Sequence, residues 1–201
     1  MSDAALSLRR MTRDEFRRWT DAQPRGRFER LDGHVVATAP ERAAHNRLKA
    51  AAWLTLRRAI AEAGVACEAF IDGITVEVGE STDYEPDVVV SCGARMADDA
   101  IAAPNPVIVV GVLSPSTSAI DTTRKLADYF SLPSVRQYPI LFADRRQAVH
   151  HRRSGESAGI ETRVVPAGEI RFEPPGVTIS VEEIYDEASG HPAATRSNQG
   201  P

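Results

Sequence analysis

The sequence lacks the features that mark several large classes of protein. It has only two cysteines in 201 residues, too few and too isolated for a disulfide framework or a zinc site. Because Cys67 and Cys92 lie beside apolar runs, we expect both to be buried free thiols. No apolar run approaches the roughly 20 residues of a membrane-spanning helix, and the polar N-terminus lacks the apolar segment of a secretory signal. These absences predict a cytoplasmic protein that does not bind membranes.

The sequence also has no excess of positive over negative charge, since its formal net charge is -4. Holding nucleic acid by bulk electrostatics alone needs a concentrated basic surface, so this charge excludes that mode of binding. Arginines nevertheless gather near the N-terminus, whereas the segment after Arg153 is acidic. A basic N-terminal face could guide a polyanion, although arginines on a short helix are more often plain solvated charge. The N-terminal arginines are Arg9, Arg10, Arg13, Arg17, Arg18, Arg25, Arg27 and Arg30.

A glycine-rich phosphate loop is absent as well. None follows a predicted strand, and the turn over residues 114–117 offers hydroxyls but not the run of free backbone amides that cradles a phosphate. This absence argues against an α/β protein that binds a small phosphorylated ligand.

The residues that are present predict a single mixed α/β domain. A hydrophobic content of 42% is enough to fill one core at this length, so we assign residues 1–187 to one domain. The tail over residues 188–201, rich in Ala, Ser, Gly and Pro, has too little to bury and should be disordered. The apolar runs Val88–Val90 and Val107–Leu113 have no polar face, which is typical of strands buried on both sides of a sheet. We expect them to be central neighbours.

Capping patterns and apolar periodicity place the other elements. A capping box of Thr12 and Glu15 opens a short helix, and one of Ser118 and Asp121 opens another. The predicted helices span residues 13–21, 40–64 and 118–131. The turn pair Asp32-Gly33 suits a tight hairpin. Further strands are predicted over residues 74–78, 138–143, 148–153, 161–165 and 177–181.

The strongest chemical signal is the tripeptide Glu85-Pro86-Asp87, which stands directly before a buried strand. In extended geometry Glu85 and Asp87 point to the same side. Two carboxylates aimed one way can hold a hard divalent cation, with water and a substrate phosphate as further ligands. Taken alone, the same pair could merely cap a strand end in solvent.

Read with its surroundings, this segment resembles a known family. The resemblance covers roughly residues 12 to 155, and it rests on the order and spacing of several short motifs rather than on any one of them. The motifs are Glu29-Arg30-Leu31-Asp32-Gly33, His45, Pro86-Asp87-Val88, the segment Val112-Leu113-Ser114-Pro115-Ser116-Thr117, Asp121, Lys125 and Tyr129. They resemble the Uma2 family of restriction endonucleases, within the PD-(D/E)xK nuclease superfamily.

The resemblance implies a restriction-endonuclease-like α/β fold, a central mixed sheet flanked by helices, here with additional C-terminal strands. It also implies Mg²⁺- or Mn²⁺-dependent hydrolysis of DNA phosphodiesters, and a homodimer, since double-strand cleavage generally needs two sites. Asp87 matches the metal-binding aspartate, Glu29 an acid that would orient water, and Lys125 the base that would offset charge on the phosphoryl oxygens. Asp121 and Ser114 match supporting positions.

Several of these residues also have purely structural interpretations. Asp121 and Lys125 have the spacing of an ordinary helical ion pair. Glu29 could be an exposed hairpin acid, and His45 could be a hydrogen-bonded core histidine. His150 and His151 are adjacent on a predicted strand and point to opposite faces, so they cannot hold one metal ion together.

One position departs from the family pattern. A glutamate stands two residues before the Leu-Ser-Pro segment in the family, where it is the second metal-binding carboxylate, and this chain has Gly111 there. Glu85 could supply the missing carboxylate from the same side as Asp87, or Glu77 from the preceding strand. The alternative is a catalytically inactive domain of the same fold that binds DNA or a protein.

Overall fold

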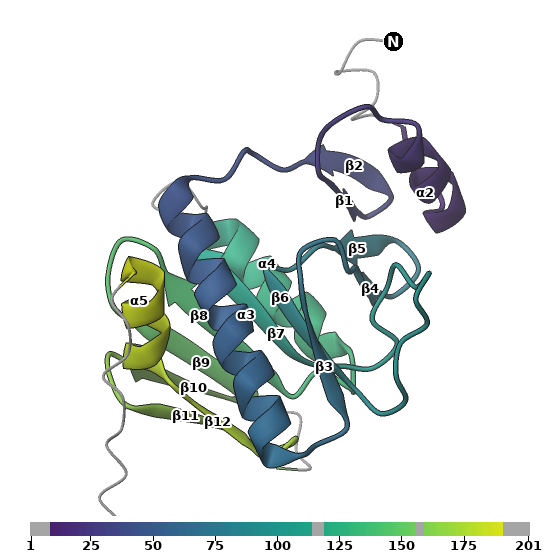
Figure 1. Cartoon of the computed structure of the whole chain (residues 1–201). Coiled ribbons are helices and arrows are strands. Elements are labelled where there is room, and N and C mark those ends of the chain that lie inside the picture. The colour runs from purple at the N-terminus through teal and green to yellow at the C-terminus, as the bar shows by residue number, and fades with distance from the viewer. Residues whose placement is uncertain (1–8, 114–118, 156–158, 191–201) are drawn as a thin grey trace, which may run out of the picture.

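A six-stranded mixed sheet forms the centre of the molecule (Figure 1). The computed structural model describes residues 9–113, 119–155 and 159–190. The strand order is β10-β9-β8-β7-β6-β3, and neighbours are antiparallel except for the parallel pair β7 and β8. The strands are β3 (Cys67–Ile71), β6 (Val88–Cys92), β7 (Pro106–Leu113), β8 (Gln137–Phe142), β9 (Ala148–Arg153) and β10 (Ile160–Val165). The predicted central mixed sheet is therefore confirmed.

The two most apolar segments of the sequence form the middle of this sheet. Val88, Val90 and Ile108 are fully buried, and β6 and β7 are central neighbours as predicted; they pair antiparallel. The chain passes from β7 to its parallel neighbour β8 through the helix α4 (Ala119–Ser131), because parallel strands need a crossover connection.

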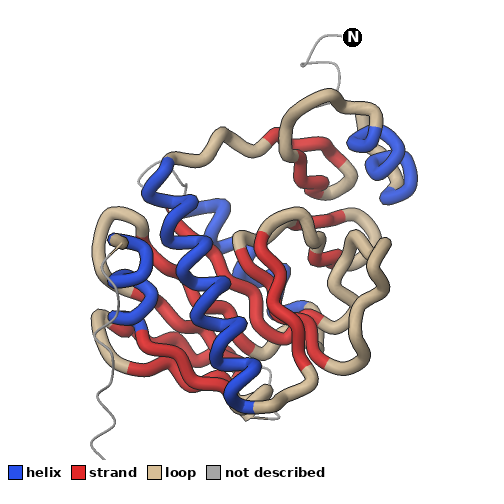
Figure 2. The backbone as a smooth tube through the Cα atoms, in the orientation of Figure 1, coloured by secondary structure: helices blue, strands red, loops and turns tan. Residues whose placement is uncertain are grey.

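Two layers cover the faces of the sheet (Figures 1 and 2). On one face the long helix α3 (Ala43–Ala63) lies beside α5 (Val181–Ser189) and packs near the hairpin of β11 (Glu169–Phe172) and β12 (Val177–Ser180). On the other face α4 packs its residues Tyr129 and Phe130 into the second core cluster. Successive side chains of a strand point to opposite faces of the sheet. Val88 therefore belongs to the core cluster under α3, and Val89 belongs to the second cluster, under α4.

A smaller sheet of order β2-β1-β5-β4 lies beside the helix α2 (Arg13–Asp21) at one end of the molecule (Figure 1). Its strands are β1 (Phe28–Leu31), β2 (His34–Ala37), β4 (Val76–Val78) and β5 (Thr82–Tyr84). The predicted hairpin is present, with Asp32 and Gly33 at φ 52° and 84°. A buried ion pair between Arg30 Nε and Asp83 Oδ2, 2.6 Å apart, ties β1 to β5.

The helix predictions hold for α2, whose capping box is present, and for the end of α4. The predicted start of the long helix at Pro40 is wrong, because Arg42 is still extended at φ -82° and ψ 153° and helix α3 begins at Ala43. Its predicted stop is correct, since Gly64 caps it in the left-handed conformation at φ 62°. Helix α5 was not predicted; Ser180 ends β12 and accepts a hydrogen bond from the Glu183 amide.

The short strands β3, β5 and β11 were also not predicted. The predicted strand over residues 74–78 is shorter, because the Ile74 amide bonds to the Asp72 carbonyl in a tight turn before β4 begins. Helix α5 runs to Ser189, past the predicted end of the domain. The rest of the predicted tail, from residue 191, and the predicted cap Ser118 lie outside the described residues. None of the described helices is long and apolar enough to cross a membrane.

The prediction of two free thiols is wrong, because Cys67 and Cys92 form a disulfide. They lie directly opposite each other on β3 and β6, with their Cα atoms 4.0 Å apart. In the next pair of residues, the Gly93 amide bonds to the Ala66 carbonyl. Because bonded and non-bonded pairs alternate in an antiparallel ladder, Cys67 and Cys92 form a pair without backbone hydrogen bonds between them, and side chains approach most closely in such pairs. Sequence spacing alone could not reveal this register.

Candidate functional site

A cavity of about 430 Å³ opens where β1, β6, β7, α4 and the start of α3 meet. Most of the side chains predicted for the site line it: Glu29, Glu85, Asp87, Gly111 and Lys125. These residues come from four separate segments of the sequence, and the two core strands β6 and β7 position Asp87 and Gly111. The structure therefore brings the predicted residues together around one cavity.

Asp87 lies at the entry to β6, and both of its carboxylate oxygens have partners. Oδ1 lies 2.7 Å from Nε2 of His45, and Oδ2 accepts a hydrogen bond of 2.6 Å from the Val112 amide. The bond to Val112 crosses from β6 to β7, so the backbone of the central sheet fixes the position of the carboxylate.

His45 is hydrogen-bonded, as expected, but its partner is the cavity aspartate rather than a core group. Its side chain lies in the first turn of α3 and lines the cavity. Burial would lower the pKa of His45, but the hydrogen bond and the negative charge of Asp87 outweigh burial, and the pKa is raised. The imidazolium form is therefore favoured while Asp87 is its partner.

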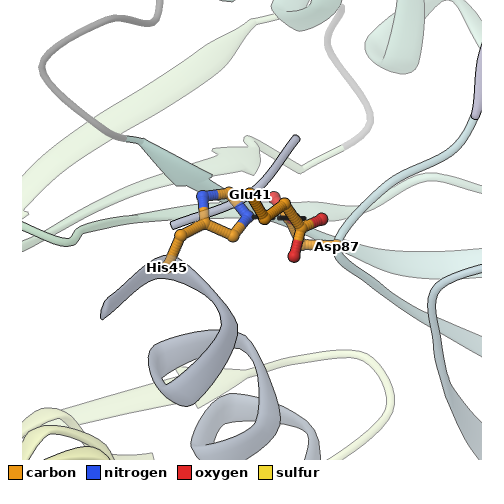
Figure 3. Close-up of side chains that lie close together, drawn as sticks. All are labelled: Glu41, His45 and Asp87. Carbon is orange, nitrogen blue, oxygen red and sulfur yellow. Dashed lines mark hydrogen bonds and ion pairs between the residues drawn. The ribbon is translucent and has the colours of Figure 1, made fainter. Parts of the chain in front are cut away.

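Glu41 joins this pair and was not predicted as a site residue. Its Oε1 lies 3.9 Å from Nε2 of His45, and ligand atoms of Glu41, His45 and Asp87 all lie within 4.8 Å of one another (Figure 3). Lys49 and Arg27 hold the Glu41 carboxylate. The four-residue spacing of Glu41 and His45 could have signalled the pair, but Glu41 lies just before the helix and not on it.

Lys125 and Glu29 form a second pair at the same cavity. Lys125 Nζ on α4 lies 3.0 Å from Glu29 Oε1 on β1, and the Glu29 side chain is only 5% exposed. The same Glu29 oxygen accepts a hydrogen bond of 3.1 Å from the Glu85 amide, and the Lys125 ammonium lies 5.1 Å from the ring centre of Tyr84. Glu29 is therefore a buried acid that positions Lys125, and not an exposed hairpin residue.

The two acids considered as replacements for the missing carboxylate are both engaged by other groups. Glu85 Oε1 accepts hydrogen bonds from Arg27 at 3.0 Å and from the Gly73 amide at 2.8 Å. Glu77 forms ion pairs with Arg13 and Arg17 against α2, and it does not line the cavity. Glu85 lines the cavity wall, with its carboxylate turned to Arg27.

Gly111 faces Asp87 across the central strands. Val88 pairs with Val110, and one further step of the antiparallel register places Gly111 opposite Asp87. A Cβ atom at Gly111 would lie 3.2 Å from Oη of Tyr138, which projects from the neighbouring strand β8. The tyrosine hydroxyl thus fills part of the space that a larger side chain at position 111 would need.

A buried aromatic group closes the floor of the cavity. Tyr138 is 3% exposed and packs edge to face against Tyr129, with ring centres 5.1 Å apart. Burial raises the pKa of Tyr129 well above its ordinary value, and the nearby acids Glu29 and Asp87 act in the same direction. Both tyrosines line the cavity.

The remaining predicted residues lie elsewhere or cannot be placed. Ser114 lies outside the described residues, and Asp121 lies in α4 with a side chain outside the described part. His150 and His151 point to opposite faces of β9 as predicted, since His150 bonds to Gln137 and His151 to Thr162.

The architecture and the cavity define a mixed α/β protein with several carboxylates at the edge of its central strands, and comparisons with known proteins name its family. The profile of the Uma2 family, described as "Putative restriction endonuclease", matches residues 13–185. The chain belongs to the Uma2 family.

The chain is also similar to two other proteins. A protein of Synechocystis, described as "Uncharacterized protein sll1609", is 25% identical over 156 residues, which are 76% of this chain and 87% of that protein. The crystal structure of a "putative nuclease belonging to DUF820" from Anabaena variabilis superimposes with a TM-score of 0.69. It covers 89% of this chain and 99% of the other at 16% identity, so the likeness concerns the fold.

Proposed function

We propose that the chain is a nuclease that hydrolyses DNA phosphodiesters with the help of a divalent cation, at the cavity around Asp87. The observation that carries the proposal is the convergence of two groups of side chains on one cavity. Asp87, His45 and Glu41 bring their ligand atoms within 4.8 Å of one another, and Lys125 is held by Glu29 in the same cavity.

The donor set suits a divalent cation. Two carboxylates and one imidazole are ligands that Mn²⁺ accepts, provided that His45 releases the proton that its pair with Asp87 favours, whereas Mg²⁺ prefers oxygen donors alone. We therefore expect Asp87, Glu41 and His45 to hold Mn²⁺ more tightly than Mg²⁺. When bound, such a cation supplies Lewis acidity that polarises the phosphate and lowers the pKa of a water molecule.

The remaining side chains have roles that follow from their contacts. Lys125 presents a positive charge, fixed by the buried Glu29, to the space beside Asp87, where it would offset charge that develops on the phosphoryl oxygens. Glu29 is a positioning residue in this scheme, since its carboxylate bonds to Lys125 and to the Glu85 amide.

Glu85 stays a prediction as a metal ligand. To reach a cation beside Asp87, its carboxylate would have to leave Arg27 and the Gly73 amide. Calorimetric titration with Mn²⁺ separates the two arrangements. We expect Glu41→Gln to abolish binding and Glu85→Gln to change the affinity little, whereas the reverse result would identify Glu85 as the ligand.

The alternative is a domain of the same fold that binds DNA or a protein without cutting. The observation that favours it is at Gly111, where the Tyr138 hydroxyl lies 3.2 Å from the position of a Cβ atom, in place of the family's second carboxylate. The resemblance further predicts a homodimer, and the composition predicts a cytoplasmic location; both remain predictions.

Cleavage of supercoiled plasmid DNA in Mg²⁺ or Mn²⁺, with a chelator as control, tests the proposal. We expect nicking by the unsubstituted chain and a loss of about 100-fold or more in Asp87→Asn and in Lys125→Met. Asp98→Asn is the matched control, because the Asp98 side chain is 91% exposed and does not line the cavity.

Two results would reject the proposal. Nicking that survives Asp87→Asn would belong to another site or another protein. An unsubstituted chain that binds DNA but never cuts it, with either cation, would establish the alternative.

A further inference from the structure

Strand β10 forms an edge of the six-stranded sheet, opposite the edge formed by β3 (Figure 1). Among the described residues, no strand pairs with its outer side. Such edges are usually protected by charged side chains, especially lysine, or by proline, a bulge or a very short strand. β10 has six residues, contains neither lysine nor proline, and pairs with β9 in continuous register.

One face of β10 carries exposed apolar side chains. Ile160 is 40% exposed and Val164 is 54% exposed, and they are two of the four exposed large hydrophobic residues in the described part of the chain. They lie on one face of the strand with Thr162 between them. The charged side chains of this edge are one acid and one base, Glu161 and Arg163, so it is suited to pairing with a strand that matches both its apolar side chains and its charges.

The backbone hydrogen bonds of β9 determine which groups of β10 point outward. The Ser154 amide bonds to the Gly159 carbonyl, directly beyond the pair Arg153 and Ile160, whereas the Arg153 amide bonds to Arg136 on the other side of β9. Antiparallel pairs alternate between bonded and non-bonded. Ile160, Thr162 and Val164 therefore direct their amides and carbonyls away from β9.

These outward groups restrict how two copies of β10 could pair. In a symmetric antiparallel pair, outward residues must face outward residues, so the twofold axis passes through position 161, 162 or 163. An axis at Glu161 or at Arg163 would place like charges opposite each other. An axis at Thr162 places Glu161 opposite Arg163 of the second copy, and Ile160 opposite Val164.

We propose that β10 is a homodimer interface, in which two copies of this chain pair antiparallel about Thr162 and join their sheets into one. The register matches Ile160 with Val164 and Glu161 with Arg163, it places the two Thr162 residues opposite each other on the axis, and each outward amide meets a carbonyl. β8 and β9 separate β10 from β7, so the pairing leaves both cavities around Asp87 open. The inference does not rest on the proposed nuclease activity.

Sedimentation analysis of the full chain over a range of concentrations tests the interface. We expect a species of twice the chain mass of 21.9 kDa. Thr162→Pro removes an outward amide but no backbone bond to β9, and it should yield monomers. Thr162→Val is its control, because it also loses the hydroxyl that bonds to His151 but keeps the outward amide. Arg163→Glu should weaken the dimer by about tenfold or more, because it places two carboxylates opposite each other on both sides of the axis.

The charge-reversed double variant Glu161→Arg with Arg163→Glu supplies the decisive control. It restores opposite charges across the axis, so the dimer should return in part. The return is partial because the arginine introduced at position 161 lies beside Arg152, the ion-pair partner of Glu161 in the native chain. Circular dichroism and thermal unfolding establish that every variant is folded. A native chain that is monomeric at all concentrations, a dimer unaffected by Thr162→Pro and Arg163→Glu, or a double variant that stays monomeric would each overturn the proposal.

Discussion

Restoring a carboxylate at Gly111 should require a second change at Tyr138. The backbone at Gly111 accepts a side chain, since its φ is outside the left-handed region, but a Cβ atom would lie 3.2 Å from Tyr138 Oη. Replacing a strand glycine gains roughly 0.5–1 kcal/mol in backbone entropy, whereas overpacking costs about 1–3 kcal/mol. We therefore expect Gly111→Glu alone to destabilise the fold by up to about 2 kcal/mol.

Tyr138→Phe removes the hydroxyl and leaves the ring carbon Cε2 at 3.5 Å as the nearest contact, which is an ordinary van der Waals distance. In the double variant, Gly111→Glu with Tyr138→Phe, the new carboxylate lies opposite Asp87. Without a cation, the two like charges should lower stability. With Mn²⁺ at about one hundred times its Kd, binding to the folded state should raise the free energy of unfolding by about 2.7 kcal/mol.

Thermal unfolding in chelator and in Mn²⁺, together with calorimetric titration, measures this stabilisation. The matched control is Gly111→Gln with Tyr138→Phe, which adds the same volume without the charge. Equal Mn²⁺ affinity in the glutamate and glutamine variants would refute the reasoning, because it would mean that position 111 does not contribute a ligand.

Three further predictions concern other parts of the molecule. Glu29→Gln should reduce nicking by lowering kcat rather than raising KM, since Lys125 loses its ionic partner; unchanged kcat would contradict this role. Replacing Cys67 and Cys92 by serine should lower the free energy of unfolding by about 3 kcal/mol, because the disulfide closes a loop with a separation of 25 residues; urea titration with and without reductant measures the loss. Burial and neighbouring positive charges lower the pKa of His150 to about 4, whereas the unfolded value is about 6.5. The neutral form of His150 therefore contributes its full stabilisation above pH about 6.5, and the free energy of unfolding falls by up to about 3 kcal/mol as the pH drops to about 4. In urea titrations at a series of pH values, His150→Gln should lack this part of the dependence of the free energy of unfolding on pH. An equal pH dependence in the two proteins would contradict the assignment.

Short sequence motifs predicted the helices, turns and strands that depend on residues adjacent in the sequence. The capping box of Thr12 and Glu15 defined α2, and the turn pair Asp32-Gly33 defined the first hairpin. The continuous valine runs defined the centre of the sheet, because only strands covered on both faces can lack polar positions. In each case the deciding residues are neighbours in the sequence.

Contacts between distant segments could not be predicted in this way. The disulfide depends on the register of β3 against β6, and β3 has no alternation that would mark it as a strand. Glu41 reaches the cavity because the chain stays extended to Arg42, whereas the helical pattern suggested a start at Pro40. The proximity of Tyr138 to Gly111 depends on the parallel register of β7 and β8.

The charge of the cavity links the two functional alternatives. Glu29, Glu41, Glu85 and Asp87 each already have a positive partner or a backbone amide, so the cavity acids are largely compensated by the protein itself. A fifth carboxylate at Gly111 would have had no such partner, and it would have needed a cation to offset its repulsion of Asp87. With glycine there, a phosphate meets less negative charge before any cation binds. Glycine at position 111 therefore lowers the need for a metal ion in the cavity more than it lowers the ability of the cavity to accept a DNA phosphate. Cleavage and binding must for this reason be measured separately.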